Sequence, residues 1–177
     1  MNKKKNNKGF SLIELIIAIA ILIILTGLLA PQFMKYIEKS REAKDMQTLD
    51  TVYTVMQGAL ADEKAYTDFV AQTSGDSGKL KDIDKGMKFE SLLADASACD
   101  YTKEIKNLLG TSSNVKLTSK KAGANAVVCV QVIYKPAGDA ADLATADTLA
   151  ITVYAGDKDA KPIKGLDVVG APYTTTP

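Results

Sequence analysis

The sequence predicts an α+β fold in which a long N-terminal helix, apolar in its first half and amphipathic in its second, packs on a small antiparallel β-sheet head with a short extra helix. Three observations carry this prediction. An apolar run with one acidic residue in it extends from residue 10 to residue 30. Apolar side chains then recur every three or four positions as far as about residue 69. Beyond residue 114, alternating polar and apolar residues indicate strands.

The charge of the chain is unevenly distributed. The 177 residues carry a formal net charge of +1, which excludes a strongly basic nucleic-acid-binding protein. Lysines at positions 3, 4, 5 and 8 precede the apolar run, and acidic residues outnumber basic ones once residues 1–9 are set aside. The chain contains no histidine, so imidazole catalysis and histidine metal ligands are excluded. No pairing of a nucleophile with a base is visible, and we expect no enzyme and no cofactor.

The apolar run from Phe10 to Ala30 is long enough to cross a bilayer as a helix. The lysines before it keep the N-terminus on the cytoplasmic side and place the rest of the chain outside. A removable secretory signal would need a shorter apolar core and small residues at the cut, whereas residues 28–30 read Leu-Leu-Ala and are followed by Pro31. A plain single-span anchor remains an alternative, but it does not explain Glu14, whose charge is costly if it faces lipid.

The start of the chain resembles the class III signal sequence of type IV pilins and the related pseudopilins. The resemblance rests on a short basic leader, Lys8-Gly9-Phe10, Glu14 and the long apolar run in fixed order. It implies that a prepilin peptidase cuts between Gly9 and Phe10 on the cytoplasmic face and that Phe10 becomes an N-methylated first residue. It also implies further partners, namely the membrane, a pilus assembly ATPase, a platform protein and other copies of the chain itself.

Glu14 then has two interpretations. Cleavage creates a positive α-ammonium on Phe10, and a buried charge needs a partner. The resemblance implies that Glu14 supplies that partner to an adjacent subunit during assembly. The alternative is local stabilisation by the helix macrodipole, which is worth about 0.3–1 kcal/mol.

The far end of the apolar run contains poor helix residues. Glycine and proline destabilise a helix, and proline also removes a backbone hydrogen bond. By resemblance we expect a kink or local melting around Gly27 and Pro31, and the sequence also allows a continuous kinked helix.

The segment 31–70 reads as the amphipathic half of the same helix. Its apolar stripe consists of Met46, Leu49, Tyr53, Met56 and Leu60. Turn residues at 74–78 end it, and a shorter helix is expected from about Phe89 to Leu109, stopped by Gly110.

Three strands are expected in the head that follows, residues 71–177. They cover residues 114–120, 126–135 and 147–155, and residues 121–125 close the first pair as a hairpin. Residues 156–177 read as loops and a loose tail.

Cys99 and Cys129 leave two possibilities open. The extracytoplasmic location permits a disulfide, but both lie on apolar segments where buried thiols are ordinary. The disulfide that some pilins form near their C-terminus does not match, because no cysteine lies near the end of this chain. The acidic residues Asp157, Asp159 and Asp167 lack calcium-loop spacing, so no metal site is expected.

The resemblance favours a structural subunit of a type IV pilus, most simply a major pilin, for adhesion, motility or biofilm formation. Its prepilin would be a single-pass inner or cytoplasmic membrane protein, and the assembled form an extracellular filament. The alternatives are a pseudopilin of a type II secretion or DNA-uptake machine, a minor pilin, and a membrane-anchored binding module.

Overall fold

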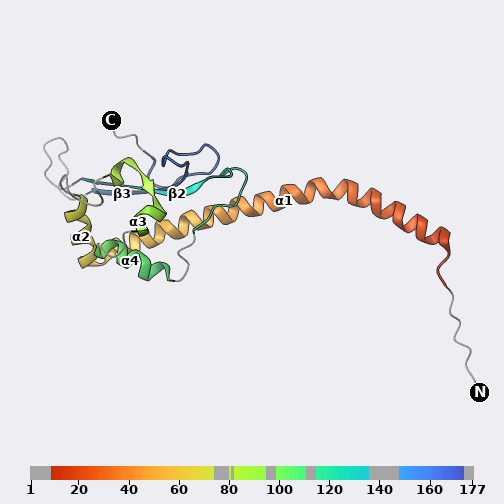
Figure 1. The fold of residues 1–177 in the computed structure, drawn as a ribbon, viewed down its shortest axis with the longest axis horizontal. Helices are drawn as coiled ribbons and strands as arrows, with labels where there is room; N and C mark the ends of the chain where they lie inside the picture. The colour runs from red at the N-terminus through yellow and green to blue at the C-terminus, as the bar shows by residue number, and fades with distance from the viewer. Residues whose placement is uncertain are drawn as a thin grey trace, which may run out of the picture. The chain divides into compact units, whose positions relative to one another are not determined.

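A computed structural model describes residues 9–73, 80, 82–94, 99–110, 115–135 and 148–173. The chain divides into two compact units, Met1–Ser40 and Arg41–Pro177, and each is described by itself. The helices are α1 (Leu12–Ala61), α2 (Glu63–Thr73), the short 3₁₀ helix η1 (Ile83–Lys85), α3 (Phe89–Ala94) and α4 (Asp100–Leu109). The strands are β1 (Met87–Lys88), β2 (Val127–Lys135), β3 (Thr148–Gly156) and β4 (Val169–Gly170), as Figure 1 shows in part.

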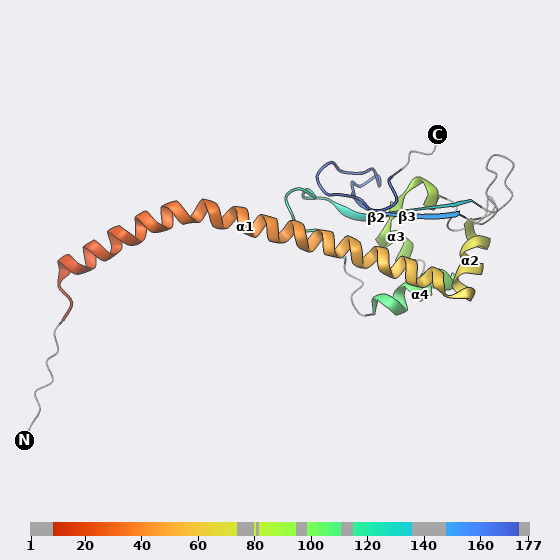
Figure 2. The ribbon, with the colours of Figure 1, turned by 180° about the vertical axis from the view of Figure 1, so that it is seen from behind.

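The described strands form one antiparallel sheet in the order β1-β2-β3-β4. Its centre is the pair β2 and β3, whose residues are in register from Val127 opposite Gly156 to Lys135 opposite Thr148. Both strands are rich in β-branched and aromatic residues, which favour a half-buried pleated surface. The two strands lie side by side in both ribbon views (Figures 1 and 2).

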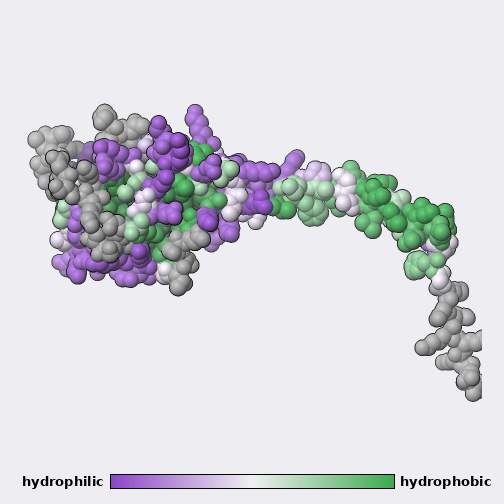
Figure 3. Space-filling view, in the orientation of Figure 1, coloured by the Kyte–Doolittle hydropathy of each residue, from purple (hydrophilic) through white to green (hydrophobic). Residues whose placement is uncertain are grey.

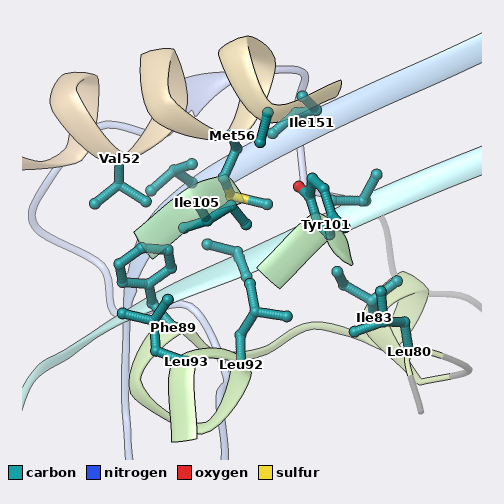
Figure 4. Close-up of a cluster of buried hydrophobic side chains, with 14 of the residues drawn as sticks. Val52, Met56, Leu80, Ile83, Phe89, Leu92, Leu93, Tyr101, Ile105 and Ile151 are labelled. Atoms are coloured by element: carbon teal, nitrogen blue, oxygen red, sulfur yellow. The ribbon is translucent and has the colours of Figure 1, made fainter. Parts of the chain in front are cut away.

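The core of the second unit lies between the C-terminal part of α1, the sheet and the short helices. Figure 4 shows Val52 and Met56 of α1 pointing into a cluster that also contains Ile105 of α4 and Ile151 of β3. All four side chains belong to one cluster of buried apolar residues. Burying such side chains is the main favourable term in folding, at about 25 cal/mol per Å² of apolar surface. The predicted α+β plan, with the amphipathic half of the helix packed on a small antiparallel sheet, is confirmed.

The helix expected to run to about Phe69 is two helices, because Asp62 starts a new one. The Asp62 side chain accepts a hydrogen bond from the backbone N–H of Ala65 at 2.9 Å. Its backbone carbonyl accepts the first helical hydrogen bond, from Tyr66. This is the geometry of an N-cap, so a local cap interrupts the apolar periodicity that predicted one helix.

The second expected helix also differs, because the structure has α3 and α4 in place of one helix from Phe89 to Leu109. The backbone N–H of Asp100, at the start of α4, donates to the Asp68 carboxylate of α2. A carboxylate at this point satisfies an N–H group that the first turn leaves unpaired. Residues 95–98 lie outside the described part.

The first expected strand is not formed, since the described residues Val115–Thr118 have no strand partner. The predicted hairpin over residues 121–125 is therefore wrong as well, and β2 pairs with β1 and β3. The segment 156–173, expected as loop, contains β4 and an isolated bridge between Gly156 and Pro162. The predicted strands at 126–135 and 147–155 correspond to β2 and β3.

Candidate processing and assembly site

The bond between Gly9 and Phe10 lies in chain that is not helical. Residues 9–11 have no secondary structure, and α1 begins at Leu12. The side chain of Phe10 is 90% exposed, and a Cβ atom at Gly9 would meet nothing within 4 Å. The peptide bond at which the sequence predicts cleavage is thus accessible and stands just before the first turn of the helix.

Glu14 closes the N-terminal end of α1. Its Oε2 accepts a hydrogen bond from the backbone N–H of Ser11 at 2.9 Å, and the Ser11 carbonyl accepts the first helical hydrogen bond from Leu15. Ser11 is therefore the N-cap residue and Glu14 the third helical residue. A glutamate at this position that reaches back to the N-cap N–H is half of a capping box.

Ser11 is a helix-capping residue that was not predicted from the sequence. The signal was present, because Ser11-Leu12-Ile13-Glu14 has the spacing Ser-x-x-Glu that is typical of a helix start. Within this single chain Glu14 thus has a local partner, the backbone N–H group of Ser11. The geometry of a single chain does not test the role of Glu14 toward an adjacent subunit, which stays a prediction.

The apolar half of α1 exposes its side chains on every side. Large apolar residues from Leu12 to Leu29 are all at least 46% exposed, and the most apolar window of the helix has no buried residue. Figure 3 shows this part as an apolar surface and the visible face of the second unit as largely hydrophilic. By length and composition, α1 could cross a membrane.

The helix continues without a break through Gly27 and Pro31. Thr26 donates its hydroxyl to the carbonyl of Leu22 at 2.7 Å, a bond within the helix that satisfies a polar group in apolar surroundings. Proline inside a helix leaves the carbonyl four residues earlier without its usual donor. Melting of this stretch in an assembled filament stays a prediction.

The two cysteines are buried free thiols in different surroundings. The Cys99 thiol hydrogen-bonds to Asp68, and burial together with this bond raises its pKa. The Cys129 thiol lies against Gly156 of β3, where a Cβ atom would come within 2.4 Å of Sγ. Burial raises the pKa of Cys129 to about 12. The disulfide that the sequence left open is not formed in this structure.

In the acidic loop after β3, the carboxylate of Asp157 binds backbone groups of the same loop. Asp157 Oδ1 accepts hydrogen bonds from the backbone N–H groups of Asp159 and Lys161, each at 2.9 Å. Within the described residues no three metal-binding side chains come together.

Comparisons with known proteins agree with the N-terminal geometry. A family model described as the prokaryotic N-terminal methylation motif matches residues 4–30. The type IV major pilin protein PilA of Myxococcus xanthus (strain DK1622) is 35% identical over 63 residues, which is 36% of this chain and 29% of that protein. A type IV major fimbrial protein FimA of Dichelobacter nodosus is 36% identical over 72 residues, 40% of this chain and 46% of that protein.

A second FimA protein of Dichelobacter nodosus is 38% identical over 61 residues, 34% of this chain and 38% of that protein. The chain thus spans less than half the length of the curated relatives it matches. No solved structure matches it significantly. The chain thus carries the prokaryotic N-terminal methylation motif directly before an exposed apolar helix, and over about a third of its length it is similar to type IV major pilins.

Proposed function

We propose that the chain is a structural subunit of a type IV pilus. It enters the membrane as a prepilin, is cleaved after Gly9, is N-methylated at Phe10 and polymerises through its N-terminal helix into an extracellular filament. One observation carries the proposal. A helix that exposes apolar side chains all round follows directly on an accessible, non-helical Gly9-Phe10 bond. A surface of this kind is covered by lipid before assembly and by other helices afterwards.

The proposal gives each part of the chain a task. Residues 1–9 form the basic leader, and residues 10–30 form the membrane and filament-core helix. Residues 31–70 form the amphipathic segment, which the structure divides between α1 and α2, and residues 71–177 form the head. Because the lysines of the leader stay in the cytoplasm, the head lies outside the cell membrane before the filament is assembled.

Cleavage changes the charge at the start of the helix. Hydrolysis of the Gly9-Phe10 bond leaves a carboxylate on the released leader and an α-amino group on Phe10. That amino group is protonated at neutral pH, because its ordinary pKa is about 7.7–8.0. A single methyl group leaves the nitrogen basic, so the mature subunit has a cation at residue 10 and an anion at residue 14.

Pairing of these two charges between neighbouring subunits would set the axial position of one helix relative to the next. In a bundle of apolar helices an unpaired charge is strongly unfavourable, whereas a paired one is tolerated. When Glu14 of one subunit meets Phe10 of the next, both charges are paired and the axial offset between the two helices is set. Prepilin peptidase, an assembly ATPase and a platform protein are the partners that this pathway requires.

Mass spectrometry of the protein from its native membrane tests the processing step. We expect loss of residues 1–9 and one added methyl group on Phe10. An intact N-terminus would contradict the proposal and leave a membrane-anchored module. Replacing Gly9 with Val, a larger residue beside the scissile bond, should leave the precursor uncut. Gly27→Val serves as a control for cleavage, because a Cβ atom at Gly27 meets nothing within 4 Å.

Electron microscopy of cells that lack the protein tests the assembly step. Loss of long surface filaments is expected for a major pilin, and their persistence would favour a minor pilin or a pseudopilin. The similarity to major pilins of two organisms supports the first outcome. Restoring the gene should restore the filaments, which excludes an indirect effect of the deletion.

A further inference from the structure

The segment 115–118 of the head is extended but has no strand beside it. It contains no turn and no helix, and its burial alternates, because Val115 and Leu117 are half-buried while Lys116 and Thr118 are exposed. Alternation with a period of two is typical of a strand. Val115 and Leu117 pack against the core. The segment therefore lies on the head like a strand without belonging to its sheet.

One edge of this segment is open. The backbone N–H of Thr118 donates to Asp45 of α1 at 2.9 Å. Successive N–H groups of an extended chain point to opposite edges, so the N–H of Leu117 points away from α1. Among the described residues, the backbone groups of Val115, Lys116 and Leu117 form no hydrogen bond. The edge that points away from α1 thus presents N–H and C=O groups that a strand could pair with.

The first residues of β2 form a second open edge. Within the described part of the chain, β1 pairs with β2 only at Cys129 and Val130, which leaves Val127 and Val128 without a strand on that side. A hollow of about 260 Å³ is lined by residues 115–117 and by residues 126–128. We call this hollow the strand slot. The loop that joins its two edges is drawn in green-blue in Figure 2.

The strand slot is apolar inside and mainly basic around its rim. Its lining includes the buried side chains of Phe89 and Val128. Lys116 and Lys120 are exposed on the segment and on the joining loop, and Glu90 is the acidic residue in the lining. Residues 115–135 contain four lysines and no acidic residue, the lysines being at positions 116, 120, 121 and 135. A bound strand would therefore be favoured by acidic side chains on its outer face.

We propose that the strand slot binds an extended acidic peptide segment of another protein by strand addition. The main chain of the peptide pairs with the open edges of residues 115–117 and 127–128. Its alternate apolar side chains point inward toward Phe89, and its acidic side chains lie outside beside Lys116. In strand addition the main-chain hydrogen bonds give affinity, and the places for alternate side chains give specificity.

This inference goes beyond the proposed function. All residues of the strand slot belong to the second compact unit, which begins at Arg41. The site therefore does not depend on cleavage after Gly9 or on assembly through the apolar helix. It adds a binding surface for a partner to the structural subunit.

Fluorescence anisotropy with a synthetic peptide tests binding. The full-length protein in detergent is titrated into a hexapeptide of alternating valine and aspartate that carries a neutral dye, with protein-free detergent as the blank. We expect saturable binding, and its absence would overturn the inference. Methylation of alternate backbone nitrogens removes main-chain donors and should weaken binding at least about tenfold. Equal binding of the methylated and unmethylated peptides would contradict strand addition.

A charge exchange tests the role of the rim. Lys116→Glu should weaken binding of the valine–aspartate peptide about threefold or more, and should strengthen binding of a valine–lysine peptide. Lys106→Glu, at an exposed position of α4, is the matched control and should change neither affinity. Equal effects of the two substitutions would contradict recognition of an acidic peptide.

A filled slot and hydrogen exchange test the location. Ala124 lines the slot and is exposed, so Ala124→Trp should block binding while the circular dichroism spectrum stays native. In the wild type, saturating peptide should slow amide exchange in residues 115–117 and 127–128 and leave α4 unchanged. Protection only outside these residues would overturn the inference. Protection that appears at high protein concentration without peptide would show a second copy in the slot, and the proposed partner would then be wrong.

Discussion

Ser119 donates its backbone N–H to Asp45 across 2.7 Å and ties a loop of the head to helix α1. Asp45 is fully buried and also accepts the backbone N–H of Thr118 at 2.9 Å. Beside this contact, Lys121 of the same loop forms an ion pair with Glu42 at 2.8 Å. The loop thus obtains from α1 the hydrogen bonds that a strand partner would otherwise supply.

Removing the Asp45 carboxylate should release this loop. Asp45→Ala leaves the N–H groups of Thr118 and Ser119 without acceptors, and we expect the free energy of unfolding to fall by about 2–3 kcal/mol. Urea unfolding of the full chain in detergent, followed by circular dichroism, measures this change. Asp50→Ala on an exposed face of the same helix should change stability by no more than about 0.5 kcal/mol. Equal effects of the two substitutions would contradict the role given to Asp45.

The same carboxylate makes stability depend on pH. Burial alone would raise the pKa of Asp45, but hydrogen bonds from Ser119 and Thr118 outweigh it and lower the pKa below 3.8. Because the unfolded chain then binds this proton more readily than the folded one, stability is complete above about pH 4 and is lost as pH falls through the folded pKa. Urea midpoints measured between pH 2 and 6 should decline more steeply for the wild type than for Asp45→Asn.

Tyr101 and Tyr154 should respond oppositely to loss of their hydroxyl groups. Tyr101 is fully buried and its hydroxyl has no partner among the described residues, whereas Tyr154 donates its hydroxyl to the carbonyl of Ala160 at 2.7 Å. We expect Tyr101→Phe to raise the free energy of unfolding by up to about 1 kcal/mol and Tyr154→Phe to lower it by about 1 kcal/mol. Thermal unfolding of the two variants side by side checks the signs. A loss of stability in Tyr101→Phe would indicate an acceptor for that hydroxyl.

The two cysteines should behave as protected thiols. Burial raises the pKa of both, that of Cys129 to about 12, so neither forms the reactive thiolate at pH 8. An aromatic disulfide reagent should titrate fewer than about 0.1 thiols per chain in native protein and both after denaturation. Omitting reductant should leave this count unchanged. Zero thiols in denatured, unreduced protein would show a disulfide instead.

Glu14→Ala should separate processing from assembly. The proposed cleavage site lies before the helix, which begins at Leu12, so we expect normal cleavage after Gly9, measured by mass spectrometry. We expect assembly to fail, because the Phe10 ammonium would lose its partner. The yield of sheared filament protein should fall at least tenfold, which corresponds to about 1.4 kcal/mol in the free energy of assembly. Glu90→Ala, on an exposed position of α3, serves as the matched control. Normal filament yield from Glu14→Ala would reduce Glu14 to a helix cap.

Local patterns predicted those elements whose residues need no distant partner to define them. The apolar run predicted the start of α1, and dense β-branched residues predicted β2 and β3. The serine of the capping box could have been read in the same way, since Ser11 and Glu14 are three residues apart. The break at Asp62 was also a local signal, but the apolar periodicity on both sides of it concealed the cap.

The other differences have tertiary causes. Val115 and Leu117 alternate as in a strand, yet the backbone N–H of Thr118 bonds to a carboxylate 73 residues earlier in the chain. Similarly, the Ala171 N–H donates to the Ile151 carbonyl at 2.8 Å, which orders a segment whose composition indicates only loop. Alternation of polar and apolar residues shows which face of a segment is apolar. It does not show which group accepts the hydrogen bonds that the backbone N–H groups of the segment donate.

Composition and spacing along the chain are enough to predict the apolar helix, the lysines before it and the order of Gly9, Phe10 and Glu14. The conformation of the head depends instead on contacts between distant residues: Asp45 holds the loop that was expected to be a strand, and both cysteines are buried thiols. A buried N–H group bonds to whichever acceptor the fold brings within reach, and that acceptor can lie anywhere in the sequence.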